Sequence, residues 1–185
     1  SGNPAPDGDY VAMNKPYAAY FALRPGWNDI VIQIANYDLP GGGGIVNSIY
    51  FGYAAQISAL SNQGIAHDWI LITAFLIMGL YFIGMFSQRR DDVFLITFGS
   101  VCIFMALYIS TNGERVLWNV IDSCPFWLYY RIQILSAIGV GSSFLLYLYT
   151  AFRPFCSRWL VRSGLILAAA LTVMSARGQI EGACV

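Results

Sequence analysis

The chain has 185 residues, of which 57% are hydrophobic and only 11% are charged. This composition excludes an ordinary soluble domain, in which about a quarter of the residues are charged. Ten Lys and Arg residues balance ten Asp and Glu residues, so the chain has no basic field with which to bind nucleic acid. The composition therefore predicts an integral membrane protein.

The first residues give no sign of a secretion signal. Residues 1–6 are polar and rich in proline, without the charged region and the apolar region of a signal peptide. If the segment that follows lies outside the cytoplasm, either a leader has been removed or the sequence belongs to a longer chain. Both alternatives stay open.

Residues 1–66 predict a β-rich segment. Residues 17–24 and 28–36 each place apolar side chains on one face at period two, which is typical of half-buried strands. Pro25-Gly26 between them is a turn signal, so we expect an antiparallel hairpin, and a third candidate strand follows at 45–52. Three strands leave an edge unpaired, so we expect another polypeptide to complete the sheet. The apolar side chains expected to face that partner are Tyr17, Phe21, Leu23, Ile30, Ile32 and Ile34.

Residues 67–185 predict a transmembrane domain, because four stretches approach the length of about 20 apolar residues that crosses a bilayer. A tryptophan begins three of these spans, as an aromatic belt would require, and an arginine lies within about one turn of two span starts, where it can snorkel to the headgroups. The expected membrane anchors are Trp69, Trp127, Trp159, Arg131 and Arg162. The expected spans are 69–86, 93–110, 127–150 and 159–176.

The predicted fold class is therefore an α+β membrane protein. It combines a small extracytoplasmic antiparallel β-sheet, like part of a jelly-roll sandwich, with an α-helical transmembrane bundle of about four spans. Five arginines lie in or beside the loops that follow the first and third spans, against three near the membrane on the other side. The positive-inside rule then places the N-terminus and the 111–126 loop outside the cytoplasm.

Two features of the spans predict packing. Between the second and third spans, residues 114–121 place Val116, Leu117, Val120 and Ile121 on one helical stripe beside Trp118, which predicts a short helix in the outer interface. Asn112-Gly113 before this helix and Cys124-Pro125 after it are the expected breaks. Small residues at intervals of four in the last two spans predict close helix contacts, although Gly and Ala are also simply frequent in membrane helices. These small residues are Ala137, Gly139, Gly141, Ser143, Gly164 and Ala168.

Residues that could carry chemistry are few. His67 is the single histidine and lies beside Asp68 at the outer edge of the first span. We interpret it as an interfacial polar residue and, as the alternative, as an axial ligand to one tetrapyrrole. The four cysteines lie far apart, and Cys124 and Cys184 are the pair expected on the outer side, where a disulfide can form. No catalytic motif is present, so the sequence predicts no enzyme, no metal and no cofactor, with bound lipid expected.

The order of these pieces resembles the bacterial seven-transmembrane receptors with diverse intracellular signalling modules. The matching pieces are LRPGWN at 23–28 with its strand, the strand ending at Gly52, LIMGLY at 76–81 and RRD at 89–91. In that family a periplasmic jelly-roll sensory domain precedes a seven-helix membrane domain that drives a cytoplasmic kinase, cyclase or phosphatase. The resemblance implies a bacterial inner membrane and a periplasmic ligand. This sequence departs from the family because it lacks the early strands, the last three spans and the output domain.

Two functions from different classes follow. The favoured one is a non-catalytic integral-membrane subunit that scaffolds or stabilises a larger membrane complex and docks through its β-segment. It accounts for the missing receptor parts. The alternative is the sensor and membrane portion of a bacterial receptor, which relays periplasmic ligand binding to a cytoplasmic signalling module. The expected partners are other membrane protein subunits and the lipid bilayer.

Overall fold

The computed structural model describes residues 16–34, 48–121, 125–152 and 158–177. These residues form five helices and no strand, and internal contacts divide the chain into two units, Ser1–Gly64 and Ile65–Val185. The helices are α1 (Ala54–Gln88), α2 (Val93–Thr111), α3 (Val116–Val120), α4 (Phe126–Ala151) and α5 (Arg158–Arg177). Cys124 and Cys184, for which the sequence favours free thiols and leaves a bridge open, lie outside the described residues.

The predicted β-sheet is wrong for the part of the chain that the structure describes. Residues 16–34 and 48–53 contain no strand and no cross-strand backbone hydrogen bond. The six side chains expected on the apolar face are all exposed, from 51% for Ile32 to 70% for Tyr17. A period-two pattern becomes a strand only when a neighbouring strand takes up its backbone hydrogen bonds. The α+β class is therefore corrected to a helical class.

The turn at Pro25-Gly26 is nevertheless present. Gly26 has φ +109°, in the left-handed region that glycine adopts without strain. The side chain of Asn28 closes the turn, since its Oδ1 accepts a hydrogen bond from Arg24 N at 3.1 Å. Its Nδ2 donates to the carbonyl oxygens of Arg24 and Gly26 at 2.9 and 3.0 Å. The turn forms because its hydrogen bonds are local, whereas those of the sheet are not.

Helix α1 begins earlier than the sequence pattern predicted. It runs for 35 residues from Ala54, shortly after the region of the predicted third strand, so residues 54–66 are helical and not β-rich. Residues 54–66 have no proline and are rich in alanine, the best helix former. At about 1.5 Å per residue, α1 is about 52 Å long, whereas the hydrocarbon core of a bilayer is about 30 Å thick.

Three helices, α1, α2 and α4, are long and apolar enough to cross a membrane. They coincide with the first three predicted spans, so the transmembrane prediction is confirmed for their length and composition. Helix α5 coincides with the fourth predicted span, but its described apolar part, Val161–Ser175, is shorter than the length of about 20 residues that crosses a bilayer. That α5 crosses the membrane therefore stays a prediction.

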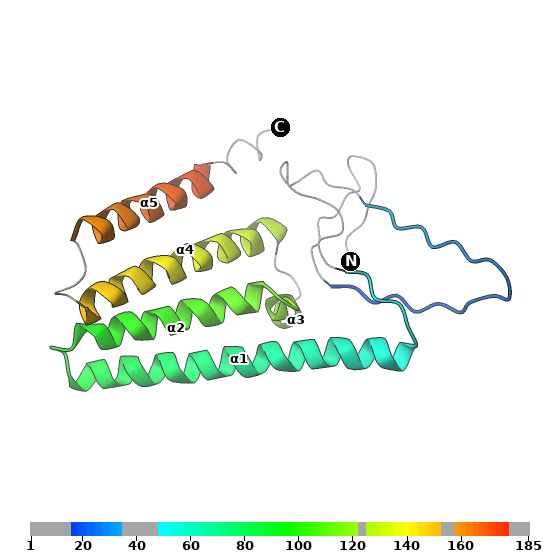
Figure 1. Ribbon diagram of the computed structural model, residues 1–185, viewed down its shortest axis with the longest axis horizontal. Helices are drawn as coiled ribbons and strands as arrows, with labels where there is room; N and C mark the ends of the chain where they lie inside the picture. The colour runs from blue at the N-terminus through cyan, green and yellow to red at the C-terminus, as the bar shows by residue number, and fades with distance from the viewer. Residues whose placement is uncertain (1–15, 35–47, 122–124, 153–157, 178–185) are drawn as a thin grey trace. The chain divides into compact units, whose positions relative to one another are not determined.

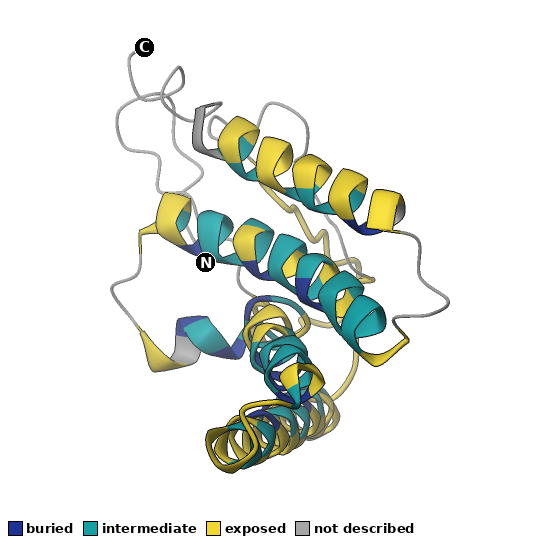
Figure 2. Ribbon diagram, turned by 90° about the vertical axis from the view of Figure 1, so that its left-hand side faces the viewer, coloured by how far each residue is buried: buried dark blue, intermediate teal, exposed yellow. Residues whose placement is uncertain are grey.

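In the second unit, the part of α1 that follows Gly64 and helices α2, α4 and α5 lie side by side in chain order, each antiparallel to the one before (Figure 1). Exposed residues cover the side of α5 that faces away from α4 (Figure 2). Short α3 lies at the end of the bundle where α2 ends and α4 begins. We call this end the joint end, after the polar contacts described below. The loop at 89–92 between α1 and α2 lies at the opposite end.

Glycines set the closest contacts between these helices. A Cβ atom placed on Gly79 of α1 would lie 3.2 Å from the carbonyl oxygen of Gly99 of α2, and the reverse distance is also 3.2 Å. A Cβ on Gly139 would overlap the ring of Phe104, and one on Gly164 would lie 2.6 Å from Leu145 Cδ1. Backbones approach this closely only where side chains are absent.

Candidate functional site

The most elaborate polar arrangement in the structure starts where α2 ends. Thr111, its last residue, is fully buried, and its Oγ1 donates to the carbonyl oxygens of Leu107 and Tyr108 at 3.3 and 2.9 Å. Asn112 caps the helix, with its backbone N–H directed to the carbonyls of Ile109 and Tyr108 and its Nδ2 donating to the latter at 2.9 Å. These contacts give partners to the carbonyl groups of Tyr108 and Ile109, which lie in the last turn of α2.

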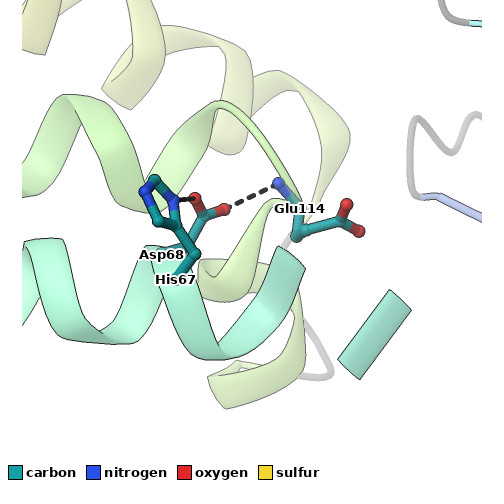
Figure 3. A network of polar contacts seen from close by, with 3 residues as sticks. All are labelled: His67, Asp68 and Glu114. Carbon is teal, nitrogen blue, oxygen red and sulfur yellow. Dashed lines mark hydrogen bonds and ion pairs between the residues drawn. The ribbon is translucent and has the colours of Figure 1, made fainter. Parts of the chain in front are cut away.

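A tight turn follows and receives a carboxylate from α1. Gly113 has φ +58°, and the backbone N–H of Glu114 donates to Asp68 Oδ2 at 2.8 Å (Figure 3). A Cβ on Gly113 would lie 2.5 Å from that same oxygen. Glycine is therefore required here twice, by its backbone conformation and by the approach of Asp68. Because Asp68 is buried to 9% exposure, losing this hydrogen bond would remove a partner from a buried carboxylate, which is costly.

Helix α4 holds the other side of the same turn. The hydroxyl of Tyr129, itself 1% exposed, donates to the carbonyl oxygen of Thr111. One turn further along α4, Gln133 Nε2 donates to Asn112 Oδ1 at 2.9 Å. Residues four apart share one face of a helix, so α4 directs both groups to the end of α2. We call this set the polar joint: Asp68, Thr111, Asn112, Gly113, Glu114, Tyr129 and Gln133.

Helix α3 packs beside the polar joint. Val116 contributes to an apolar cluster with Ile72 and Ala106, and the ring of Trp118 lies 4.9 Å from that of Tyr129. The predicted short helix is thus confirmed, and Asn112-Gly113 is its break as expected. The predicted stripe is partly wrong, because Val120 and Ile121 are exposed at 61% and 44%. A helix of only five residues is too short to keep one stripe buried along its length.

The electrostatics of the polar joint centre on two acids. Burial raises the pKa of Glu114, and the nearby Asp68 carboxylate raises it further. Both effects disfavour the charged form of the Glu114 side chain. His67 lies on the other side of Asp68, with Nδ1 3.8 Å from Oδ1, but its side chain is 70% exposed. Because solvent surrounds the histidine, this ion pair contributes little to stability.

The arrangement can hold helices and titrate, but it has no catalytic geometry. No nucleophile is paired with a base in the polar joint. No group of three or more His, Cys, Asp and Glu side chains that could hold a metal ion occurs among the residues that the structure describes. His67 lies at the surface, and its alternative role as a tetrapyrrole ligand stays an untested prediction.

The opposite end of the bundle has simpler contacts. Thr97 of α2 and Thr150 of α4 share a hydrogen bond between their Oγ1 atoms at 3.0 Å. The ring of Phe98 lies 4.7 Å from that of Phe82 and 5.2 Å from that of Tyr147. These aromatic contacts connect α1, α2 and α4.

The residues singled out by the sequence are spread over the structure and do not form one site. Arg131 lies over the ring of Trp127, 5.1 Å from its centroid. The other two tryptophan anchors are exposed, and so is Arg162. Of the small residues, Gly139, Ser143 and Gly164 face neighbouring helices. Ala168 is half-buried, whereas Ala137 and Gly141 are exposed on α4.

Sequence reasoning missed the polar joint. Asp68 was noted only as a neighbour of His67, although an acid at the edge of an apolar span is a functional candidate by default. Tyr129 and Gln133 lie four residues apart in a largely apolar span, and that spacing is the signal in the sequence for a shared polar face.

Comparison of the chain with protein-family models, with curated proteins and with solved structures gave no match. The function is therefore argued from the residues and their geometry.

Proposed function

We propose that this chain is the membrane relay portion of a bacterial receptor, which passes a change in its extracytoplasmic segment to the cytoplasmic side. The observation that carries the proposal is the continuity of α1 from Ala54 to Gln88. The helix starts at Ala54 in the first unit and continues to Gln88 in the second. An unbroken helix moves as a rigid element, which is the usual carrier of signals across distances of this size.

The polar joint supports the same function. Asp68 lies in α1 about four turns after its start and holds the turn that connects α2 with α3. A displacement of α1 along or across its axis must therefore strain or break a specific buried hydrogen bond. Arg89 and Arg90 at the other end of α1 favour a cytoplasmic position for that loop. The resemblance to bacterial receptors is a further argument for the relay.

We prefer the relay to the docking subunit because the docking subunit requires a β-sheet as its contact surface. The described residues of that region contain no strand. One observation favours a second candidate function, that of a non-catalytic membrane subunit. Every large apolar side chain in residues 16–34 and 48–53 is at least 51% exposed. Apolar surface of this extent usually marks a contact with another molecule, so a non-catalytic subunit of a membrane complex remains the alternative proposal.

The relay is tested by breaking α1 near its start and observing its far end. Ala59→Pro interrupts the helix, whereas Ala54→Pro falls in the first turn, where proline is tolerated. The readout is the labelling rate of Arg90→Cys by a thiol reagent in cells, with a membrane-impermeant reagent reporting its side. We expect Ala59→Pro to change the rate at least twofold and Ala54→Pro to leave it unchanged. Equal rates in both variants would contradict the relay.

The subunit is tested by purification in mild detergent. If it is correct, residues 16–53 are cleaved rapidly by protease in the isolated chain and are protected when a partner co-purifies. A chain that is monomeric and resistant to protease on its own would contradict it.

A further inference from the structure

We propose that α1 rocks against α2 about the contact between Gly79 and Gly99, so that opening of the polar joint moves the opposite end of α1 in the reverse direction. The inference rests on the relay function for its biological role. Its physical basis is a difference in how the helices of the second unit are fastened.

Helices α2 and α4 form a frame that is hydrogen-bonded at both ends. At the joint end, Gln133 holds Asn112 at 2.9 Å and Tyr129 holds the carbonyl of Thr111. At the opposite end, Thr97 and Thr150 are 3.0 Å apart. Hydrogen bonds are directional. Such bonds at both ends of α2 and α4 therefore prevent the two helices from tilting relative to each other.

Helix α1 is fastened to this frame at one end. Within the described part of the second unit, the bond from Glu114 N to Asp68 is the one hydrogen bond that joins an α1 side chain to the frame or its loop. Below it, α1 meets α2 through apolar groups such as Ile72 against Ala106. Apolar contacts are not directional, so they permit a small rotation that hydrogen bonds would resist.

The glycine pair supplies the pivot. The two backbones touch there, since a Cβ on either glycine would lie 3.2 Å from the carbonyl oxygen of the other. Ile103 and Ile83 flank the contact, at 2.8 and 2.9 Å from the same Cβ positions. At about 1.5 Å per residue, Asp68 lies about 16 Å from the pivot on one side and Ser87 about 12 Å on the other. Motion at the joint therefore reaches the far end reversed and slightly reduced.

Aromatic residues and the loop at 89–92 would respond to this motion at the end of α1 away from the polar joint. Phe82, less than a turn beyond Gly79, contacts the ring of Phe98 at 4.7 Å, and Phe98 contacts Tyr147 of α4 at 5.2 Å. Beyond them, the ion pair of Arg89 with Asp92 measures 4.0 Å and is exposed, so it offers little resistance. A shift of α1 would thus be felt by the aromatic contacts and by the loop at 89–92.

The experiment measures two distances between spin labels in the full chain, in lipid nanodiscs and with its four native cysteines replaced. Ser87→Cys with Ala151→Cys reports α1 against the frame, and Phe94→Cys with Ala151→Cys reports the frame alone. Asp68→Ala opens the joint. The matched control, Glu114→Gln, keeps the backbone N–H that Asp68 binds. If Asp68→Ala does not fold, Asp68→Asn serves as a milder opening.

We expect Asp68→Ala to shift the mean distance between positions 87 and 151 by about 1–2 Å, the usual size of helix shifts in switching proteins. The frame distance should not change, and Glu114→Gln should change neither distance. An unchanged 87–151 distance, or an equal shift of the frame pair, would overturn the proposal.

The pivot is tested by adding Gly79→Ala to the open variant, with Gly84→Ala as its control. A Cβ at Gly84 meets nothing within 4 Å, so the 87–151 shift should persist when Gly84→Ala is added. It should fall at least by half when Gly79→Ala is added. Equal shifts in both would overturn the pivot. The spin-label experiment leaves the N-terminal segment unchanged, so it can succeed when the relay test fails. If the 87–151 distance shifts as expected but Arg90→Cys is labelled equally fast in both proline variants, the rocking motion is supported and the relay is contradicted.

Discussion

The extended stretch 16–34 and helix α1 both carry many large apolar side chains but form different structures. In α1 each backbone group finds its partner four residues away, so the helix forms from its own sequence. In 16–34 the alternating pattern suits a strand, yet the backbone has no neighbouring strand to bond, and the side chains stay exposed. An apolar pattern predicts which face a segment would bury, but only local hydrogen bonding lets that segment form alone.

A proline in each region should separate them most strongly. Ile70 in α1 and Val31 in the extended stretch are both exposed, at 68% and 81%, so their replacement loses little packing. We expect Ile70→Pro to lower the free energy of unfolding by about 3 kcal/mol or more, because it removes a helical hydrogen bond. Val31→Pro should leave the free energy nearly unchanged. Circular dichroism during unfolding in mixed detergent micelles measures both, and equal effects would contradict the contrast.

Left-handed glycines give the next largest difference. Gly113 has φ +58° and would place a Cβ 2.5 Å from Asp68 Oδ2, whereas Gly26, with φ +109°, has open space around it. Gly113→Ala should therefore cost about 2–3 kcal/mol of unfolding free energy through strain and displacement of the carboxylate. Gly26→Ala should affect its own turn only. The same unfolding assay decides, and a neutral Gly113→Ala would contradict the geometry of the polar joint.

A smaller contrast lies within α1 itself. Gly79→Ala crowds Ile103 at 2.8 Å and should cost about 1–3 kcal/mol, the usual range for overpacking. Gly84→Ala is a matched change in open space and should be neutral or stabilise the helix by about 0.5–1 kcal/mol. Thermal unfolding of the two single variants measures the difference. If Gly84→Ala costs as much as Gly79→Ala, the backbone contact is not where the structure has it.

The smallest expected effect is that of pH on the polar joint. Because the pKa of Glu114 is raised in the folded chain above its ordinary value of 4.5, the folded state binds this proton more tightly than the unfolded state. Stability from this group therefore increases as the pH falls through the raised pKa, and is lost as the pH rises. Glu114→Gln should unfold at a slightly higher temperature than the natural chain at about pH 7, with the gap closing toward about pH 5. A gap that widens on acidification would contradict the sign.

The sequence by itself determined the parts whose hydrogen bonds are local. Continuous apolar stretches located α1, α2 and α4, and Asn112-Gly113 and Pro25-Gly26 marked a helix end and a turn, since a cap or turn needs only nearby residues. The start of α1 was missed because residues 54–66 are too polar to appear as part of a span. Tertiary structure alone decided the rest. Only packed helices could bring Asp68 to the N–H of Glu114, 46 residues away, and only a neighbouring strand could have turned the alternating pattern of 16–34 into a sheet. No spacing within a segment encodes a partner so distant along the chain.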